Sequence, residues 1–144
     1  MQRILFVCLG NICRSPTAEA VVRAKAPHLH LESAGTASYH IGKPPYGPMQ
    51  QAASVAGYDL SRLRARQFKP RDFNAFDLIV AMDAENLEEI EAQRPPATQT
   101  PVILMREDGQ AVPDPYYTRD FTGALTIIED AADALIRRYC ALGK

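Results

Sequence analysis

The stretch Cys8-Leu9-Gly10-Asn11-Ile12-Cys13-Arg14-Ser15 constrains the fold of this chain more than any other. It follows the apolar run 4–7, which is short and rich in β-branched and aromatic residues and therefore predicts a buried strand. The segment 16–26 is rich in Ala and Val and predicts a helix, with the Ser15 hydroxyl as its cap and Pro16 at its first position. The sequence thus predicts a tight loop that joins a buried strand to the amino end of a helix.

This loop has the composition of an anion-binding nest. Gly10 and Asn11 are the two residue types that most readily adopt a positive φ. Successive N–H groups in such a loop can point inward, and the positive end of the following helix dipole lies beneath them. We therefore expect the loop to bind a phosphate group.

The loop also carries a nucleophile and a ligand for phosphate. Cys8 stands at its start, where the loop amides, the amino end of the helix and Arg14 all favour the thiolate form of the side chain. Arg14 can donate two parallel hydrogen bonds to the phosphate that Cys8 would attack. The alternative is a buried structural cysteine and an unrelated surface arginine. The position of the pair at a strand-to-helix turn favours a phosphatase site.

Length and composition narrow the class of protein. The chain has 144 residues, 47% of them hydrophobic and 23% charged, so residues 1–144 are expected to form a single domain with a core. The formal net charge is −1, without a basic run that would indicate nucleic-acid binding. No apolar stretch approaches membrane length, so no membrane association is expected. Three cysteines without an export signal predict a cytoplasmic location.

Strand and helix patterns alternate along the chain. Strands are expected at 4–7, 28–33, 76–81 and 102–104, and helices at 16–26, 48–56, 84–93 and from 120 to about 139. This alternation predicts a doubly wound, flavodoxin-like α/β domain with a four-stranded parallel sheet and helices on both faces. Such sheets bind ligands at the carboxyl ends of their strands, where Cys8 is expected.

Three other polar features have simpler interpretations. His28 and His30 alternate on a strand without further metal ligands at a suitable spacing, so we favour a solvated face and expect no metal. Asp83 is predicted to cap the helix that follows it and to do nothing more. Cys140 borders the apolar stripe of the last helix and is predicted to be structural.

Two motifs, residues 7–16 and Asp114-Pro115-Tyr116-Tyr117, resemble those of the low-molecular-weight protein tyrosine phosphatases. Segments that match the same family in order and spacing are 33–36, 57–61, 64–67 and 76–83. The resemblance covers essentially the whole chain. It implies hydrolysis of phosphotyrosine and aryl phosphates through a phosphocysteine intermediate, without a cofactor. The substrate would be a phosphotyrosine-containing protein, with a bacterial tyrosine autokinase as one candidate.

The resemblance also assigns roles to residues. Cys8 is the nucleophile and Arg14 binds the phosphate, as do Leu9, Gly10, Asn11, Ile12 and Cys13 of the loop. Ser15 hydrogen-bonds the thiolate, and Ser33 supports the loop through Asn11. An Asp in a Pro-rich loop is usually a turn former. The match to the family's acid loop instead implies that Asp114 protonates the leaving oxygen and later deprotonates the attacking water.

Aromatic residues are implied to form the substrate cleft. Tyr39 lies in the long loop 36–48, where the family frequently has a tryptophan, and Tyr116 and Tyr117 follow Asp114. For Tyr39 the alternative is an exposed loop tyrosine without a role. Leu63 stands where many relatives have a histidine, so the hydrogen bonds of that histidine are missing or replaced.

The second loop cysteine, Cys13, bears on oxidation, and other sequence features bear on three alternative functions. By resemblance, Cys13 can form a reversible disulfide with Cys8 and so protect it from over-oxidation. Arsenate reduction needs a mobile cysteine pair beyond the loop, and only Cys140 remains for it. Arginine phosphatases carry threonine where this chain has Ile12 and lack the second pair of aromatics in the acid loop, so phosphotyrosine is favoured. A domain that only binds phosphotyrosine is expected to lack one of the three catalytic candidates, and all three are present.

Overall fold

The computed structural model describes residues 2–140, except for the side chain of Cys140, whose predicted structural role therefore lies outside the described residues. Its four strands are β1 (Arg3–Cys8), β2 (His30–Gly35), β3 (Leu78–Ala81) and β4 (Val102–Leu104). They form one sheet in the order β2-β1-β3-β4, and every neighbouring pair is parallel. The predicted parallel sheet is confirmed, with the second strand two residues further along the chain than expected.

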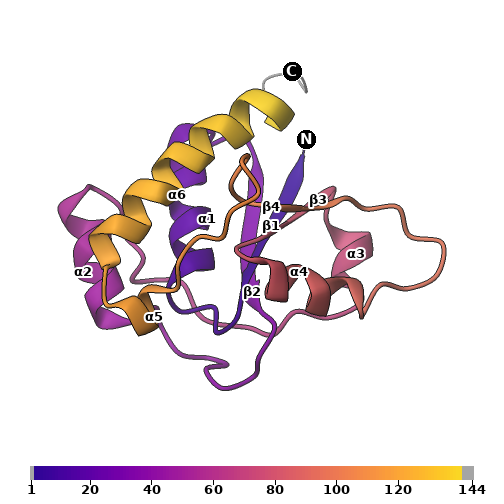
Figure 1. The fold of residues 1–144 in the computed structure, drawn as a ribbon, viewed down its shortest axis with the longest axis horizontal. Helices are drawn as coiled ribbons and strands as arrows, with labels where there is room; N and C mark the ends of the chain where they lie inside the picture. The colour runs from indigo at the N-terminus through magenta and orange to yellow at the C-terminus, as the bar shows by residue number, and fades with distance from the viewer. Residues whose placement is uncertain (1, 141–144) are drawn as a thin grey trace.

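Helices cover both faces of this sheet (Figure 1). Their bounds are α1 (Arg14–Lys25), α2 (Gly47–Val55), α3 (Asp72–Ala75), α4 (Ala84–Glu91), α5 (Pro115–Thr118) and α6 (Phe121–Leu135), which continues as the π-helical turn η1 (Ile136–Cys140). The α1 and α6 helices pack together on one face, with α2 against α6, while α4 packs on β3 and β4 from the other face. The fold is therefore the predicted doubly wound α/β fold. None of the described helices has the length and apolarity needed to span a membrane.

Side chains of the central strand β1 alternate between two hydrophobic cores. Ile4, Phe6 and Cys8 belong to the larger core beneath α1 and α6. Leu5 and Val7 belong to the second core, on the side of α3 and α4. A parallel strand that is buried on both faces reads as a continuous apolar run, which is why the sequence predicted β1 so directly. The alternation places Cys8 on the α1 side of the sheet, at the carboxyl end of its central strand.

The loops at this end of the sheet are joined by backbone hydrogen bonds. The chain leaves β1 to form β2 on one side and returns to form β3 on the other, so a switch point lies beside Cys8. Thr36 N–H donates to the Cys8 carbonyl (2.9 Å), and Met82 N–H donates to the Val7 carbonyl (3.1 Å). Val112 N–H in turn donates to the Met82 carbonyl (2.9 Å). The segments after all four strands therefore meet around the loop that follows β1.

Candidate active site

The loop after β1 encloses the Cys8 sulfur. Asn11 N–H points at Cys8 Sγ (3.3 Å), and Ser15 Oγ lies 3.1 Å from the same atom. Among the hydrogen bonds of the described residues, none takes the loop amides of Gly10, Ile12 or Cys13 as donors. These amides are thus free to bind an anion, as the predicted nest requires.

Asn11 determines the course of this loop. Its backbone has a φ of 59°, whereas Gly10 is not in the left-handed region. Its Nδ2 donates to Ser15 Oγ (2.7 Å) and to Ser33 Oγ (3.0 Å), and its Oδ1 accepts from Arg66 N–H (3.0 Å). The contact with Ser33 was predicted, but the contact with Arg66 was missed because a backbone amide leaves no signal in residue type.

Ser15 does not cap a helix, and that prediction was wrong. Helix α1 begins at Arg14, with Cys13 as N-cap and no side-chain cap hydrogen bond. The Ser15 hydroxyl points into the loop, where the buried Cys8 sulfur and the Asn11 amide group take the place of the helix amides. The role that the resemblance implied, a hydrogen bond to the thiol, matches this position.

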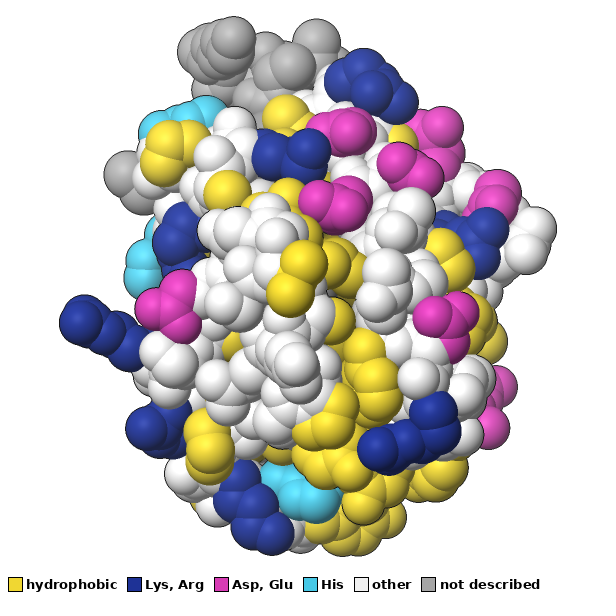
Figure 2. All heavy atoms as spheres, turned by 90° about the vertical axis from the view of Figure 1, so that its left-hand side faces the viewer, with side chains coloured by type: hydrophobic (Ala, Val, Ile, Leu, Met, Phe, Trp, Pro, Cys, Tyr) yellow, Lys and Arg dark blue, Asp and Glu magenta, His cyan; other side chains and the backbone are white. Residues whose placement is uncertain are grey.

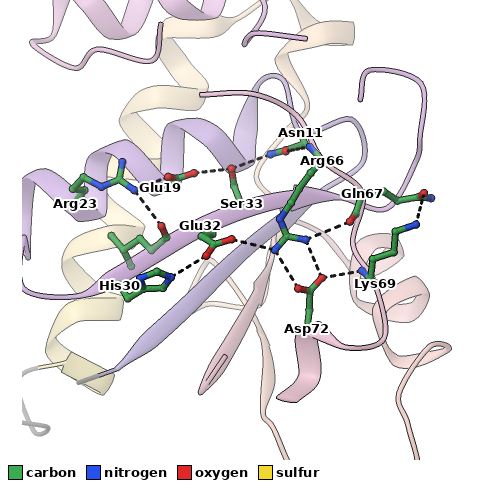
Figure 3. Close-up of polar contacts among 11 residues, drawn as sticks. Asn11, Glu19, Arg23, His30, Glu32, Ser33, Arg66, Gln67, Lys69 and Asp72 are labelled. Atoms are coloured by element: carbon green, nitrogen blue, oxygen red, sulfur yellow. Dashed lines mark hydrogen bonds and ion pairs between the residues drawn. The ribbon is translucent and has the colours of Figure 1, made fainter. Parts of the chain in front are cut away.

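A polar network continues from Asn11 away from the cleft, as Figure 3 shows. Ser33 Oγ donates to the buried Glu19 (2.7 Å), whose carboxylate is paired with Arg23 (2.5 Å). On the other side, the Arg66 guanidinium binds both oxygens of buried Asp72 at 3.1 Å. Each of these two buried carboxylates is therefore paired with the guanidinium of an arginine that is partly exposed to solvent.

Arg14 is buried between two carboxylates. Only 3% of its side chain is exposed, and its Nη1 donates to Asp83 Oδ2 (2.7 Å) and to the Val112 carbonyl (3.0 Å). Its Nη2 lies 3.4 Å from Asp114 Oδ2. Burial opposes the positive charge, but the charge of Cys8 and the hydrogen bond to Asp83 outweigh it and raise the pKa of Arg14. The guanidinium therefore stays charged beside the thiol.

Asp83 is more than a cap, which corrects the prediction. Its Oδ1 does accept from Asn86 N–H (2.8 Å) at the start of α4, as predicted. Its other oxygen, Oδ2, holds Arg14. The second contact joins residues 69 positions apart, so a local capping signal could not indicate it.

Cys13 differs from Cys8 although both are buried, free thiols in the same loop. Burial, together with the nearby charges of Cys8 and Asp114, raises the pKa of Cys13 to about 12. Cys13 is therefore protonated at neutral pH and a poor nucleophile.

Aromatic side chains form the walls of a cleft above the loop. The cleft is lined by Cys8, Leu9, Gly10, Ile12, Cys13, Arg14, Tyr39, His40, Asp114, Tyr116 and Tyr117. Tyr39 and Tyr117 are about 70% exposed at its rim. The structure thus brings the predicted residues together in the cleft lining, apart from Asn11, Ser15 and Ser33, which do not line it.

Two aromatic neighbours of the cleft were not predicted. The His40 ring lies over Gly10 so closely that a Cβ there would come within 3.0 Å of its Cδ2. Tyr46 packs against Tyr116 with 5.1 Å between ring centroids. In the sequence, the one indication that these two residues lie near the cleft is that they belong to the same Pro- and Gly-rich loop as Tyr39. Gly10 thus leaves room for the close approach of His40 and does not serve a positive φ.

Asp114 occupies the cleft wall beside Arg14. It also accepts a hydrogen bond from Tyr116 N–H (3.1 Å), which starts the short helix α5. A fifth of its side chain is exposed. Asp114 therefore starts a helical turn and also lies in the cleft, and its role as the acid stays a prediction.

The remaining sequence candidates lie away from this cleft. Leu63 packs against the larger core. His30 is exposed and hydrogen-bonds Glu32 (2.9 Å). Within residues 2–139, no three His, Cys, Asp or Glu side chains gather in a way that could hold a metal ion.

The chain matches known proteins along its whole length. Residues 3–142 match the model of the low molecular weight phosphotyrosine protein phosphatase family. A putative low molecular weight protein-tyrosine-phosphatase of Synechocystis is 41% identical over 99% of this chain and 98% of its own. The corresponding Bacillus subtilis enzyme YfkJ is 37% identical over 94% of each chain.

Solved structures agree with this match. The crystal structure of YfkJ superposes with a TM-score of 0.92 at 34% identity, over 100% of this chain and 98% of the other. A protein tyrosine phosphatase of Entamoeba histolytica, with Hepes in its active site, gives 0.90 at 34% identity over the full length of both. The fold and the family match define a phosphatase, in which the buried Cys8 begins the loop after β1. The chain belongs to the low molecular weight protein tyrosine phosphatases.

The pairing of Asp83 with Arg14 yields a first prediction. Asp83→Asn keeps a good N-cap for α4 but removes the negative charge that holds the guanidinium. We expect kcat/KM for p-nitrophenyl phosphate to fall about tenfold, because the guanidinium loses a partner that orients it. We also expect Tm to fall, because the buried Arg14 then keeps only the more distant carboxylate of Asp114. The matched control is Asp120→Asn, the same substitution at the cap of α6. Equal activity of the two variants would contradict the role of Asp83.

The difference between the two loop cysteines yields a second prediction. At pH 7, iodoacetamide should alkylate Cys8 and leave Cys13 unmodified, because only the thiolate reacts. Since burial raises the Cys13 pKa to about 12, its labelling should stay slow at every pH at which the protein remains folded. Mass spectrometry of the peptide that contains both residues measures this, and inorganic phosphate should protect Cys8. Labelling of both thiols at similar rates at pH 7 would refute it.

Proposed function

We propose that this tyrosine phosphatase hydrolyses phosphotyrosine proteins in two steps at Cys8. In the first step the Cys8 thiolate attacks phosphorus, the bond from phosphorus to the phenolic oxygen breaks, and Asp114 gives its proton to that oxygen. In the second step Asp114 takes a proton from a water that attacks the phosphocysteine. Inorganic phosphate then leaves and the thiolate is restored.

The single observation that carries this proposal is that two hydrogen-bonding groups of the loop contact the sulfur of Cys8. Cys8 Sγ lies at the base of the cleft, with Asn11 N–H at 3.3 Å and Ser15 Oγ at 3.1 Å as partners for a thiolate. Arg14 and Asp114 line the same cleft. A nucleophile, a fixed cation and a carboxyl group thus surround one space that holds a phosphate.

Electrostatic stabilisation accounts for much of the proposed rate. In this proposal the loop amides and Arg14 stabilise the charge that spreads over the phosphoryl oxygens in the transition state. Arg14 is held by Asp83 and a backbone carbonyl, so little reorganisation is needed. The proposed mechanism uses no metal or cofactor.

The shape of the cleft supports phosphotyrosine as the substrate class. Tyr39, Tyr116 and Tyr117 offer flat walls for a phenyl ring, and the buried Ile12 lines the floor beside Cys8. Aromatic and aliphatic walls favour an aryl ester over the guanidinium of phosphoarginine. Because the relatives named above include bacterial enzymes, we extend the proposal to a bacterial tyrosine autokinase as a substrate in the cytoplasm.

The proposal includes a protective oxidation. Peroxide would convert the Cys8 thiolate to a sulfenic acid, which condenses with the Cys13 thiol to a disulfide and releases water. A thiol reductant would then restore both cysteines. Residues 1–144 are proposed to carry out all of these steps as one domain.

The substrate class is tested with three peptides of one sequence that carry phosphotyrosine, phosphoarginine or phosphoserine. Without metal ions, we expect turnover of the phosphotyrosine peptide and at most a few per cent of that rate with the others, since only the phenyl ring fits between the cleft tyrosines. Release of inorganic phosphate is the measurement. A preference for phosphoarginine would overturn the assignment based on Ile12, and binding without turnover would indicate a binding domain.

The acid role of Asp114 is tested by Asp114→Ala. We expect kcat for a phosphotyrosine peptide to fall about a hundredfold or more, the usual contribution of a general acid. The fall for the formation of phosphocysteine from p-nitrophenyl phosphate should be much smaller, because nitrophenolate leaves without a proton. Pre-steady-state release of nitrophenolate separates this step from hydrolysis. Equal losses with both leaving groups would exclude Asp114 as the acid.

A further inference from the structure

Arg119 has an unusual backbone for an arginine. It follows α5 with a φ of 66° and a ψ of 12°, in the left-handed region. Glycine is the usual residue at such a helix end, because a side chain is strained there. Strained residues of this kind are concentrated at functional sites, where the side chain serves a purpose.

The Arg119 side chain is held in place at the aromatic wall of the cleft. Its guanidinium carbon lies 5.3 Å from the centroid of the Tyr46 ring and 5.1 Å from that of Phe121. Its Nη1 donates to the Tyr46 hydroxyl (3.2 Å) and to the Tyr116 carbonyl (3.3 Å). The guanidinium is exposed to solvent, but these contacts fix its orientation. Binding of a ligand to it therefore costs little conformational entropy of the Arg119 side chain.

The charge of Arg119 has no partner in the part of the chain that the structure describes. No carboxylate there lies within ion-pair distance of it, and no acceptor binds its Nε or Nη2. Two other fixed arginines, Arg66 and Arg94, are paired with Asp72 and Glu91. Arg119 thus presents planar donors that match a carboxylate.

The surroundings of the cleft differ in charge from side to side. Figure 2 shows hydrophobic side chains gathered at the lower end of the face that carries α2, α5 and α6, with Lys or Arg side chains on both sides of them. Beyond Arg14 and Asp114, by contrast, a second cavity is lined by Asp83, Glu85 and Glu89. Neither Glu85 nor Glu89 has a cation within ion-pair distance among residues 2–139. On the first flank Arg119 stands beside the aromatic wall, and the cavity that it lines also carries Asp120 and Glu129. Asp120 accepts a hydrogen bond from Gly123 N–H, and Glu129 accepts one from the Tyr58 hydroxyl, so Arg119 offers the free ionic donors on this flank, whereas the other flank offers carboxylates.

We infer that Arg119 recognises an acidic residue that flanks phosphotyrosine in the substrate. The enzyme then prefers phosphotyrosine sites with acidic residues on one side only, because acidic residues on the other side approach the carboxylates of α4. This inference rests on the proposed function, since it names the kind of phosphotyrosine protein that the site accepts. Arg119 would then determine which substrates are preferred without contacting the phosphate or the Cys8 sulfur.

Four phosphotyrosine peptides of equal length test the inference. They carry Glu at the three positions before phosphotyrosine, at the three after it, on both sides, or Gln at all six. At low salt we expect the wild-type kcat/KM to be about threefold higher for one singly acidic peptide than for the Gln peptide, as an exposed ion pair provides. The other singly acidic peptide should be the poorer substrate. The gain should lie in KM, because Arg119 does not touch the reacting atoms. It should decrease with added salt, because salt screens an exposed ion pair.

Variants separate recognition from a structural role. Arg119→Gly removes the guanidinium and the backbone strain together, and it should abolish the gain. Arg119→Lys should keep part of it. The matched control Arg71→Gln removes an equal exposed charge outside the cleft and should keep all of it.

Each other outcome has its own meaning. If Arg119→Gly retains the wild-type preference, or if the wild-type enzyme hydrolyses all four peptides equally, the inference is wrong. If Arg119→Gly loses activity on every peptide to the same extent, Arg119 only holds the acid segment in place, and the inference is again wrong. If the wild-type enzyme hydrolyses no phosphotyrosine peptide, the proposed function itself fails.

Discussion

The left-handed backbone of Asn11 is the constraint on which the site depends. A φ of 59° costs a non-glycine residue about 1 kcal/mol. Three hydrogen bonds of the Asn11 side chain offset that cost, one each to Ser15, Ser33 and the Arg66 amide. These partners come from α1, β2 and the segment before α3. The Asn11 N–H reaches the Cys8 sulfur (3.3 Å) from this backbone conformation, which the rest of the fold stabilises through the Asn11 side chain.

The second requirement is a balance of buried charge. Arg14 is almost fully buried, and an unpaired buried cation would be strongly destabilising. Asp83 and Asp114 pair with it in the structure described here. The charge of Cys8 also favours the cation, while the neighbouring thiol Cys13 stays neutral because burial raises its pKa to about 12. The same contacts fix the position of the guanidinium in the cleft that Cys8 lines.

Much of this could be predicted from the sequence, because the strongest patterns are local. Apolar runs predicted the strands, and the strand-to-helix loop indicated the candidate site. What escaped prediction depends on contacts across the fold. The Ser15 hydroxyl was predicted to cap a helix, but it hydrogen-bonds the Cys8 sulfur and the Asn11 side chain. Asp83 looked like a cap alone, since its partner Arg14 is far away in sequence. The Arg66 contact uses a backbone amide, and the position of His40 over Gly10 depends on how a long loop folds back.

The central claim is that the substrate phosphate passes through Cys8, and direct trapping of the intermediate tests it most clearly. The wild-type enzyme is mixed with excess p-nitrophenyl phosphate, quenched with acid within the first turnover and digested, and the peptides are sequenced by mass spectrometry. The account predicts phosphate on Cys8 and none on Cys13, together with a burst of nitrophenolate equal to the enzyme concentration. Steady turnover without a burst and without phosphate on Cys8 would contradict it.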